Sequence, residues 1–341
     1  MPLSDITIVI LSKGRGQELL RSLKYWDEIG VAFLVLHNTD ASLAYLSTNT
    51  KSQYFVSKTN YGTRCGLASQ KLASKYGIIC SDDEIFLPSA LAKMCETLDQ
   101  NQDIQSVGGQ TIAIGKYGPI FTATQSYSNM THYENKFDSS QSRLEFHFNL
   151  QSDYKNGAIY RLMRTQILKR LLGVFSEIST ISTPYIYEVT GEIFVTAIGK
   201  SLYIKDIFWI RNWLNEPVVH NKWNRKLYFY QWLESTEYKF EVSGWVSSIT
   251  KSISNFENDF DLAPLLPIIL IKRKMIEMHE KSKKPLRFSF LNTNIKYWIK
   301  KFLSNATLPE EAMESINSIP ATGILINKQE FKAALKALLS V

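Results

Sequence analysis

Three consecutive carboxylates, Asp82, Asp83 and Glu84, directly follow a short apolar run at 76–80. Adjacent carboxylates repel one another unless water solvates them or a divalent cation neutralises them. Hard oxygen ligands suit Mg²⁺ or Mn²⁺, and both ions keep coordination positions for substrate phosphates. The alternative is an acidic turn that caps a helix beginning at Pro88, because carboxylates stabilise helix N-termini. The triplet therefore predicts either a metal site or a helix cap.

The elements that must position this triplet alternate between strand and helix patterns over the first 115 residues. Apolar runs at 6–11, 31–36, 54–56 and 76–80 predict strands, and helical spacing of apolar residues separates them. Such alternation is typical of βαβ units and a mainly parallel sheet, in which ligands bind beyond the carboxyl ends of the strands. Polar residues at 12–15, 38–40 and 82–84 follow three of these strands, so the site is expected there. The stretch 122–141 has no clean period and predicts a loop.

The motifs in this half resemble the nucleotide-binding half of a GT-A fold glycosyltransferase. The closest resemblance is to glycosyltransferase family 2 and related bacterial sugar transferases, and it covers about residues 5–115. The shared features are a first strand ending in small polar and basic residues, a second strand ending in an Asp-containing turn, an Asn-x-Gly, and an acidic motif before a Pro-started helix. Here they are Ser12-Lys13-Gly14-Arg15, His37-Asn38-Thr39-Asp40, Asn60-Tyr61-Gly62 and Ser81-Asp82-Asp83-Glu84.

The resemblance implies roles for these residues. Asp82, Asp83 and Glu84 would hold Mn²⁺ or Mg²⁺, and Ser12 and Asp40 would contact the nucleoside. The chain lacks the family's Ala-Arg-Asn after Asn-x-Gly, so the identity of the basic side chain that contacts the diphosphate stays open. Donor contacts are expected from the set Ser12, Lys13, Arg15, Asp40, Asn60, Arg64 and Asp82, with Lys71 as a further basic candidate.

An inverting transferase of this kind needs a general base that deprotonates the acceptor hydroxyl. Glu188 and Glu192 are the candidates, since they are four residues apart on a helix predicted over 185–198 and share one face. Gly191 between them would let a ligand approach closely. The alternative is that both belong to a solvated helix face.

The charge of the chain is concentrated near its C-terminus. The 341 residues carry a net charge of +7, and ten basic and two acidic residues lie at 271–303. Because the remainder is nearly neutral, nucleic acid is not expected as a partner. Apolar and basic residues at 291–303 fit an interfacial helix on an anionic membrane surface, or a helix packed on the protein with its lysines reaching solvent.

The remaining features bear on compartment. The sequence shows no export signal and no apolar run of the roughly 20 residues that span a membrane. Three cysteines form neither a disulfide framework nor a zinc motif. A cytoplasmic location is expected, or one peripheral to the inner face of the membrane.

The sequence thus predicts an α/β, GT-A-like protein with a mainly parallel sheet flanked by helices and a mostly helical C-terminal extension. Residues 1–115 are expected to bind the nucleotide-sugar, 116–245 the acceptor, and 246–341 to form the helical, basic region. The predicted activity is metal-dependent transfer of a sugar, with a UDP-sugar as the expected donor, to a glycan or lipid-linked acceptor in bacterial surface polysaccharide synthesis. Two alternatives stay open: a nucleotidyltransferase, and a non-catalytic transferase-like subunit of an envelope-assembly complex.

Overall fold

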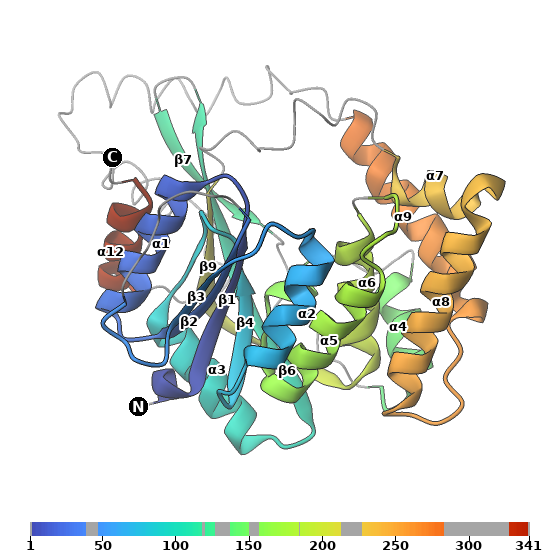
Figure 1. Cartoon of the computed structure of the whole chain (residues 1–341), viewed down its shortest axis with the longest axis horizontal. Helices are drawn as coiled ribbons and strands as arrows, with labels where there is room; N and C mark the ends of the chain where they lie inside the picture. The colour runs from blue at the N-terminus through green and yellow to red at the C-terminus, as the bar shows by residue number, and fades with distance from the viewer. Residues whose placement is uncertain are drawn as a thin grey trace.

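The computed structural model describes residues 2–38, 47–117, 120–126, 137–149, 157–183, 185–212, 227–282 and 327–339. Within them one nine-stranded sheet forms the centre of the molecule, with strand order β3-β2-β1-β4-β8-β6-β9-β5 and β7 paired to β6 (Figure 1). The strands are β1 Ile6–Ser12, β2 Ala32–His37, β3 Gln53–Val56, β4 Tyr76–Cys80, β5 Ile85–Phe86, β6 Ile104–Tyr117, β7 Ile120–Ser126, β8 Leu162–Arg164 and β9 Lys200–Asn212.

The N-terminal half of the sheet is wholly parallel. β1 lies between β2 and β4 and runs parallel to both, and β2 pairs with β3 in the same direction. The apolar runs form strands because side chains on both faces are buried: Ile8 and Ile10 enter one core cluster, whereas Val9 enters the other. The predicted βαβ organisation is therefore confirmed in this half.

The second half of the sheet mixes strand directions. The short strand β8 is antiparallel to both β4 and β6, so β6 runs in the same direction as β1. β9 is parallel to β6, and β5 pairs antiparallel with the far end of β9. The carboxyl ends of β1, β4, β6 and β9 consequently share one edge of the sheet.

Helices cover both faces of the sheet, as the two apolar clusters show. Helices α1, α3 and α12 share one cluster with the sheet. Helices α2 and α4 to α9 contribute to the second cluster, on the other face (Figure 1). The helices are α1 Gly16–Glu28, α2 Tyr61–Lys71, α3 Pro88–Gln100, α4 Ser140–Phe148, α5 Thr165–Glu177, α6 Ile186–Ala197, α7 Phe229–Glu234, α8 Lys239–Ser254, α9 Leu266–Ser282 and α12 Lys328–Leu339, with 3-10 turns η1 Pro2–Asp5, η3 Ala158–Tyr160, η4 Thr236–Tyr238 and η5 Ala263–Leu265.

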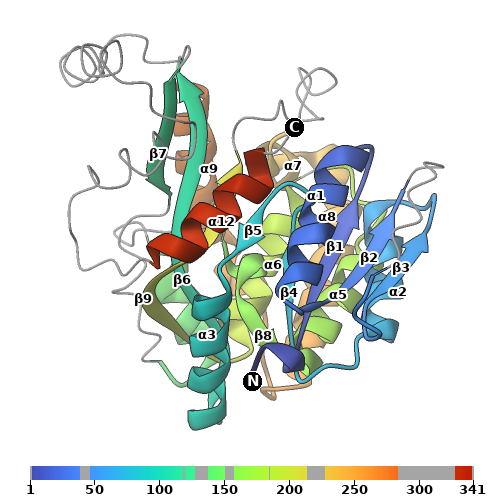
Figure 2. The same cartoon turned by 90° about the vertical axis from the view of Figure 1, so that its left-hand side faces the viewer.

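The described parts of the C-terminal extension, up to residue 282 and at 327–339, are helical, and their helices lie on both faces of the sheet. α8 and α9 pack into the cluster that holds α5 and α6, whereas α12 returns to α1 and α3 (Figure 2). Arg21 of α1 donates to the Leu338 carbonyl at 3.2 Å. The predicted α/β class with flanking helices and a helical C-terminal part is confirmed, and the region predicted as 246–341 contributes to both cores.

Two stretches differ from their sequence patterns. β7 extends to Ser126 and α4 begins at Ser140, so the predicted loop at 122–141 carries regular structure at both ends. β7 forms because it pairs antiparallel along its whole length with β6, the strand directly before it in the chain. No helix within the described ranges has both the length and the apolarity needed to cross a membrane.

Candidate active site at the carboxyl edge of the sheet

Polar side chains from β1, the start of α1 and the segment after β4 meet at the carboxyl edge of the sheet. Ser12 Oγ, at the end of β1, donates to Asp82 Oδ2 at 2.8 Å. Arg15 Nη1, at the N-cap of α1, lies 3.5 Å from Asp82 Oδ1 and also donates to Asp83 Oδ2. Because β1 and β4 are adjacent and parallel, their ends bring residues 12–15 beside 82–83, as the sequence predicts.

Glu84 faces a different part of the fold from Asp82 and Asp83. Its carboxylate accepts from Trp209 Nε1 at 2.9 Å and from Arg211 Nε at 3.3 Å, and both donors stand on β9. The antiparallel pairing of β5 with β9 sets this contact, because Ile85 lies opposite Ile210. The Glu84 side chain thus joins the acidic motif to β9.

Burial raises the pKa values of Asp82 and Glu84. Burial raises the pKa of Asp82 to about 6, and the negative charge of Asp83 adds to this effect, while Ser12 and Arg15 oppose it. Burial likewise raises the pKa of Glu84 to about 7 against the opposing charge of Arg211. Burial therefore disfavours the ionised forms of Asp82 and Glu84, and a divalent cation bound at the motif would favour them.

The fit of a divalent cation differs among the three carboxylates. Asp82 and Asp83 both reach the Arg15 guanidinium, so their oxygens approach one cationic position. Two carboxylates together with diphosphate oxygens suit Mg²⁺ or Mn²⁺. No group of three or more His, Cys, Asp or Glu side chains in the described part of the chain is placed to hold a metal ion. Asp82 and Asp83 fit the ion in this geometry, whereas Glu84 contacts Trp209 and Arg211.

The other predicted donor residues surround this edge. Lys13 is exposed beside Ser12, and Asn60 caps α2 by accepting from Thr63 N at 2.8 Å. Buried Arg64 donates through Nη1 to the Ser12 carbonyl at 2.5 Å and to the Leu36 carbonyl at 3.1 Å. Arg64 therefore joins the ends of β1 and β2 beneath the edge.

Two further predictions have different outcomes. Asp40 lies outside the described residues. Lys71 stands at the end of α2 over the Phe55 ring, and it lines a cavity together with Asp5 at the start of β1. Lys71 is one of three basic candidates for the diphosphate, together with Arg15 and Arg64. It ends α2 beside residues 4–7, at the start of β1, so it lies toward the edge of the sheet opposite Ser12 and Asp82.

Glu192 is wholly buried, with 0% of its surface exposed. Its Oε1 accepts from the backbone N–H groups of Gly157 at 2.5 Å and Ala158 at 2.7 Å, and Oε2 lies 3.1 Å from His147 Nε2. The expectation that Gly191 gives room to a ligand is wrong. A Cβ there would lie 2.0 Å from Cγ2 of Ile159, so the close neighbour is the chain itself.

Glu188 stands in the first turn of α6 and its side chain is 34% exposed. Arg273 Nη1 donates to Glu188 Oε1 at 2.9 Å, and the same guanidinium pairs with buried Glu277. The neighbouring Tyr187 ring packs against Tyr61 with centroids 4.7 Å apart. Because Tyr61 is the first residue of α2, this contact places the start of α6 beside the carboxyl edge of the sheet.

Three further residues belong to the site. Trp209 and Arg211 are sequence candidates for sugar stacking and for a phosphate contact, whereas Tyr160 is not a sequence candidate. Trp209 and Arg211 bind Glu84, and Tyr160 stacks on Trp209 with ring centroids 4.2 Å apart. The two-residue spacing of Trp209 and Arg211 is a strand signal, since alternate residues share a face. That spacing alone does not identify Glu84 as their partner, because the pairing of β5 with β9 is a long-range contact.

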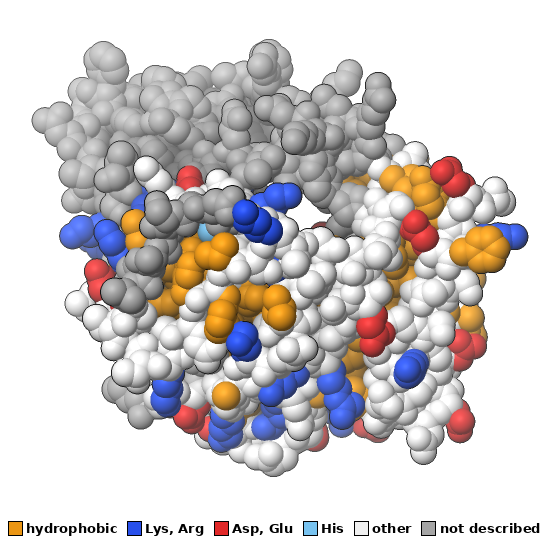
Figure 3. All heavy atoms as spheres, in the orientation of Figure 1, with side chains coloured by type: hydrophobic (Ala, Val, Ile, Leu, Met, Phe, Trp, Pro, Cys, Tyr) orange, Lys and Arg blue, Asp and Glu red, His pale blue; other side chains and the backbone are white. Residues whose placement is uncertain are grey.

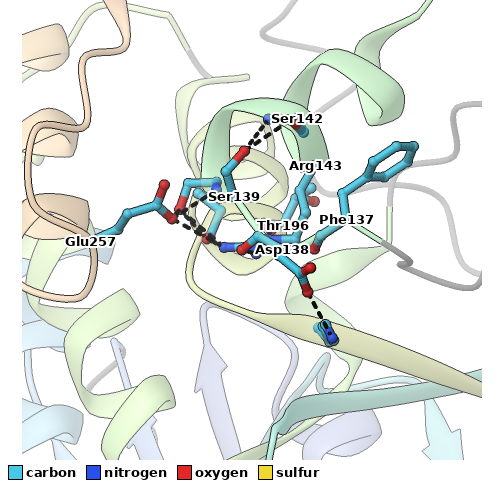
Figure 4. A network of polar contacts seen from close by, with 10 residues as sticks. Phe137, Asp138, Ser139, Ser142, Arg143, Thr196 and Glu257 are labelled. Carbon is cyan, nitrogen blue, oxygen red and sulfur yellow. Dashed lines mark hydrogen bonds and ion pairs between the residues drawn. The ribbon is translucent and has the colours of Figure 1, made fainter.

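The amino edge of the sheet carries different chemistry. An open cavity of about 530 Å³ lies near the starts of β6 and β9, and no predicted site residue lines it. Its polar groups bind one another: Glu257 accepts from Ser140 N at 2.7 Å, Arg143 donates to the Thr196 carbonyl, and Asp138 pairs with Lys200 at 3.0 Å (Figure 4). In the view of Figure 3, Lys and Arg side chains gather along the lower margin of the molecule, also at this edge.

The start of the predicted basic region is described only to residue 282. Lys272 donates to the Asn149 carbonyl at 2.7 Å, Arg273 binds the two glutamates, and Lys274 pairs with Glu234 at 2.8 Å. Lys272 and Arg273 are buried and therefore stabilise internal packing, whereas Lys274 forms an ion pair on the surface. The rest of the region, 283–303, lies outside the described residues, so membrane contact stays a prediction.

Two solved structures show a weak likeness to the chain. No family model matches the chain, and no curated protein matches it. A solved structure of S. aureus TarS 1–349 is 10% identical, covers 98% of this chain and 82% of its own, and gives a TM-score of 0.49. A second structure of S. aureus TarS is 11% identical, covers 78% of this chain and 53% of its own, and gives 0.43. Since both TM-scores lie below 0.5, neither likeness decides the function of this chain.

Proposed function

We propose that the chain is a GT-A-like glycosyltransferase that moves a sugar from a nucleotide-sugar donor to a glycan or lipid-linked acceptor in bacterial surface polysaccharide synthesis. The observation that carries this proposal is the meeting of Ser12, Arg15, Asp82 and Asp83 at the carboxyl edge shared by β1 and β4. Open α/β sheets bind ligands at this edge. A small polar group, a cation and two carboxylates are the groups that a nucleoside diphosphate with its metal ion needs.

In this proposal each side chain has a distinct task. Ser12 and Asp82 bind the nucleoside, with Asp40 as a further contact, and Arg15 and Lys13 neutralise the diphosphate. Asp82 and Asp83 hold Mg²⁺ or Mn²⁺, and that ion, when bound, stabilises the charge of the leaving diphosphate. Arg64 fixes the two strand ends from below, while Asn60 fixes the start of α2. Glu84 orients the motif against β9.

The general base of the proposal is Glu188. Glu188 is partly exposed at the start of α6, whereas all the contacts of the Glu192 carboxylate lie inside the protein. A base must reach the acceptor hydroxyl, and only an accessible carboxylate can do so. Deprotonation opposite the leaving group would invert the anomeric carbon. The nucleoside of the donor is proposed to be uridine, and a membrane surface is proposed as a partner of the stretch 271–303.

Two other functions remain as alternatives. A nucleotidyltransferase would use the same carboxylates on a nucleoside triphosphate, and it would release pyrophosphate instead of a nucleoside diphosphate. A non-catalytic subunit would bind no nucleotide-sugar in the presence of Mn²⁺. The burial that raises the pKa values of Asp82 and Glu84 supports an ion site, because a bound cation would offset the cost of ionising buried carboxylates.

The proposal is tested by thermal unfolding with a panel of nucleotide-sugars, with Mn²⁺ or with EDTA. A ligand that binds only the folded state raises the unfolding temperature. We expect at least one donor to do so with Mn²⁺ only, and Asp83→Asn to abolish the shift. Asp103→Asn is the control, because Asp103 lies at the amino edge. A shift that survives EDTA and Asp83→Asn would contradict the metal-dependent proposal.

A further inference from the structure

A continuous series of contacts joins buried Glu192 in α6 to Glu84 in the acidic motif. Glu192 binds the backbone at 157–158, and the 3-10 turn that follows ends at Tyr160. Tyr160 stacks on Trp209, and the Trp209 indole N–H binds Glu84. Each step is a direct contact. The packing on α6 therefore sets the position of the turn, and the turn then sets the position of Trp209 and of the Glu84 carboxylate that Trp209 binds.

The Glu192 end of this series is rigid. Two N–H donors share one carboxylate oxygen, and His147 contacts the other inside the core. Burial by itself would raise the pKa of Glu192, but His147, Arg161 and the Gly157 N–H together hold that pKa below its usual value. A charged carboxylate with two backbone donors fixes the turn strongly, because hydrogen bonds to ionised groups are about twice as strong as neutral ones.

The contact between the turn and α6 is also close in its backbone. Ile159 packs against the helix at Gly191, where no side chain fits. The backbone of Tyr160 is therefore fixed by the packing of η3 on α6, and its ring is fixed by stacking on Trp209 of β9. Trp209 is itself buried and touches the Arg211 guanidinium, whose carbon lies 5.0 Å from the ring centroid. Little freedom remains for the Glu84 carboxylate in this arrangement.

We propose that Glu192 is a positioning residue that sets the geometry of the acidic motif through Tyr160 and Trp209, and that it is not the general base. The inference rests on the proposed function in one respect only, namely that the acidic motif binds the donor. It explains why a carboxylate lies in the core, where an unsatisfied charge would be strongly unfavourable. It also predicts that changes at Glu192 affect donor binding before they affect the chemical step.

The first test follows the indole N–H of Trp209 by ¹⁵N NMR, with Trp209→Phe to assign the signal. Tyr160→Ala and Glu192→Ala should each move this signal, and the double variant should move it no further than one of them, because residues in one series are not additive. Tyr160→Phe keeps the ring and should leave the signal in place. Additive shifts, or no shift in Glu192→Ala, would overturn the proposal whether or not a donor binds.

The second test uses kinetics and a variant that conserves the shape of the core. Glu192→Gln can still accept from both backbone N–H groups, so it should fold even if Glu192→Ala does not. We expect Glu192→Gln to lower kcat less than tenfold and to weaken donor binding measurably. A fall in kcat of about 10²–10⁴-fold with unchanged donor affinity is the signature of a lost base, and it would overturn the proposal. Absence of donor binding by the wild type would count against the proposed function alone.

Discussion

Individual residues in the acidic motif are stabilised in unequal ways. Asp82 has a hydroxyl and a guanidinium as partners, Asp83 has the same guanidinium, and Glu84 has an indole and a second arginine. These partners leave the pKa of Asp82 at about 6 and that of Glu84 at about 7. Ionisation of the motif near neutral pH therefore costs the folded state free energy that a bound cation would return.

This unequal stabilisation predicts a pH dependence of stability. The folded-state pKa of Glu84 is raised, so the proton is held more tightly in the folded than in the unfolded chain. The contribution is fully present below about pH 4.5, the ordinary value, and is lost as the pH rises through about 7. The unfolding temperature of Glu84→Gln relative to wild type should consequently rise between pH 5 and pH 8. A constant or falling difference would contradict the assignment.

Arg15 gives a second prediction at the residue scale: its substitution should change the affinities for two ligands in opposite directions. Its guanidinium bridges the two carboxylates that are proposed to hold the ion. Arg15→Gln should tighten binding of Mn²⁺ alone, because a competing cation is removed. It should weaken binding of UDP with Mn²⁺ by roughly 10- to 100-fold, since a hydrogen bond between charged groups contributes about 1.5–3 kcal/mol.

Isothermal titration measures both affinities of the Arg15 variant. Lys24→Gln is the control, because Lys24 is an exposed cation in α1, nine residues beyond Arg15 and with no role in the proposed donor site. If Arg15→Gln changes both affinities in the same direction, Arg15 does not exchange between the carboxylates and the diphosphate.

At the scale of whole elements, the packing of α6 on η3 depends on one glycine. Gly191→Ala would place a Cβ 2.0 Å from Ile159, whereas nothing lies within 4 Å of a Cβ added at Gly173 in α5. Overpacking of a core typically costs 1–3 kcal/mol, so Gly191→Ala should destabilise the chain by about that amount. Gly173→Ala should be neutral or stabilising by up to about 1 kcal/mol. Urea unfolding measures both, and equal effects would refute this packing.

The docking of α12 provides another prediction about an element. Glu330 accepts from the backbone N–H of Ser89 at 3.1 Å and from its hydroxyl, at the start of α3. Glu330→Ala should destabilise the protein by about 1 kcal/mol, as loss of a helix cap does. Glu330→Gln keeps an acceptor oxygen and should cost less. Identical urea midpoints for wild type and Glu330→Ala would show that this cap contributes nothing.

The sequence predicted elements well where burial alone defines them. The continuous apolar runs before Ser12 and Ser81 have no surface-facing position, so they were recognisable as strands of a parallel sheet. β7 follows β6 after two residues, and it was missed because residues 120–126 show no clean alternation of apolar and polar side chains. The length of β9 could not be predicted, because it depends on long-range pairing with β6. For the same reason the contact of Glu84 with Trp209 was hidden. The proximity of residues 12–15 to 82–83 was predictable, since adjacent parallel strands end together.

The two glutamates on one face of α6 show a further limit of sequence analysis. A four-residue separation places Glu188 and Glu192 on one face of α6, and this is what the structure has. The face, however, passes from the partly exposed helix start into the core within one turn. Periodicity describes the direction of a side chain around the helix and not its depth, so sequence could not separate an accessible carboxylate from a buried one.

At the scale of the whole molecule, the fold places two groups of polar residues at opposite edges of the sheet, because its main strands run in one direction. The acidic motif, Ser12 and Arg15 lie at the carboxyl edge, whereas the cavity near the starts of β6 and β9 and the lysines near the start of β1 lie at the amino edge. The first turn of α6, which carries Glu188, packs beside the first turn of α2. The donor and acceptor sides of the proposed reaction therefore approach the same edge from two different elements.

The central claim is glycosyl transfer at this edge, and the leaving group tests it most directly. The protein is incubated with nucleotide-sugars, Mn²⁺ and a panel of glycan and lipid-linked acceptors, and the released nucleotide is identified by chromatography. We predict release of a nucleoside diphosphate that requires Mn²⁺ and falls by about 10²–10⁴-fold in Glu188→Gln, the usual contribution of a general base. Release of pyrophosphate from a nucleoside triphosphate instead, or a diphosphate release that Asp83→Asn leaves unchanged, would contradict the account.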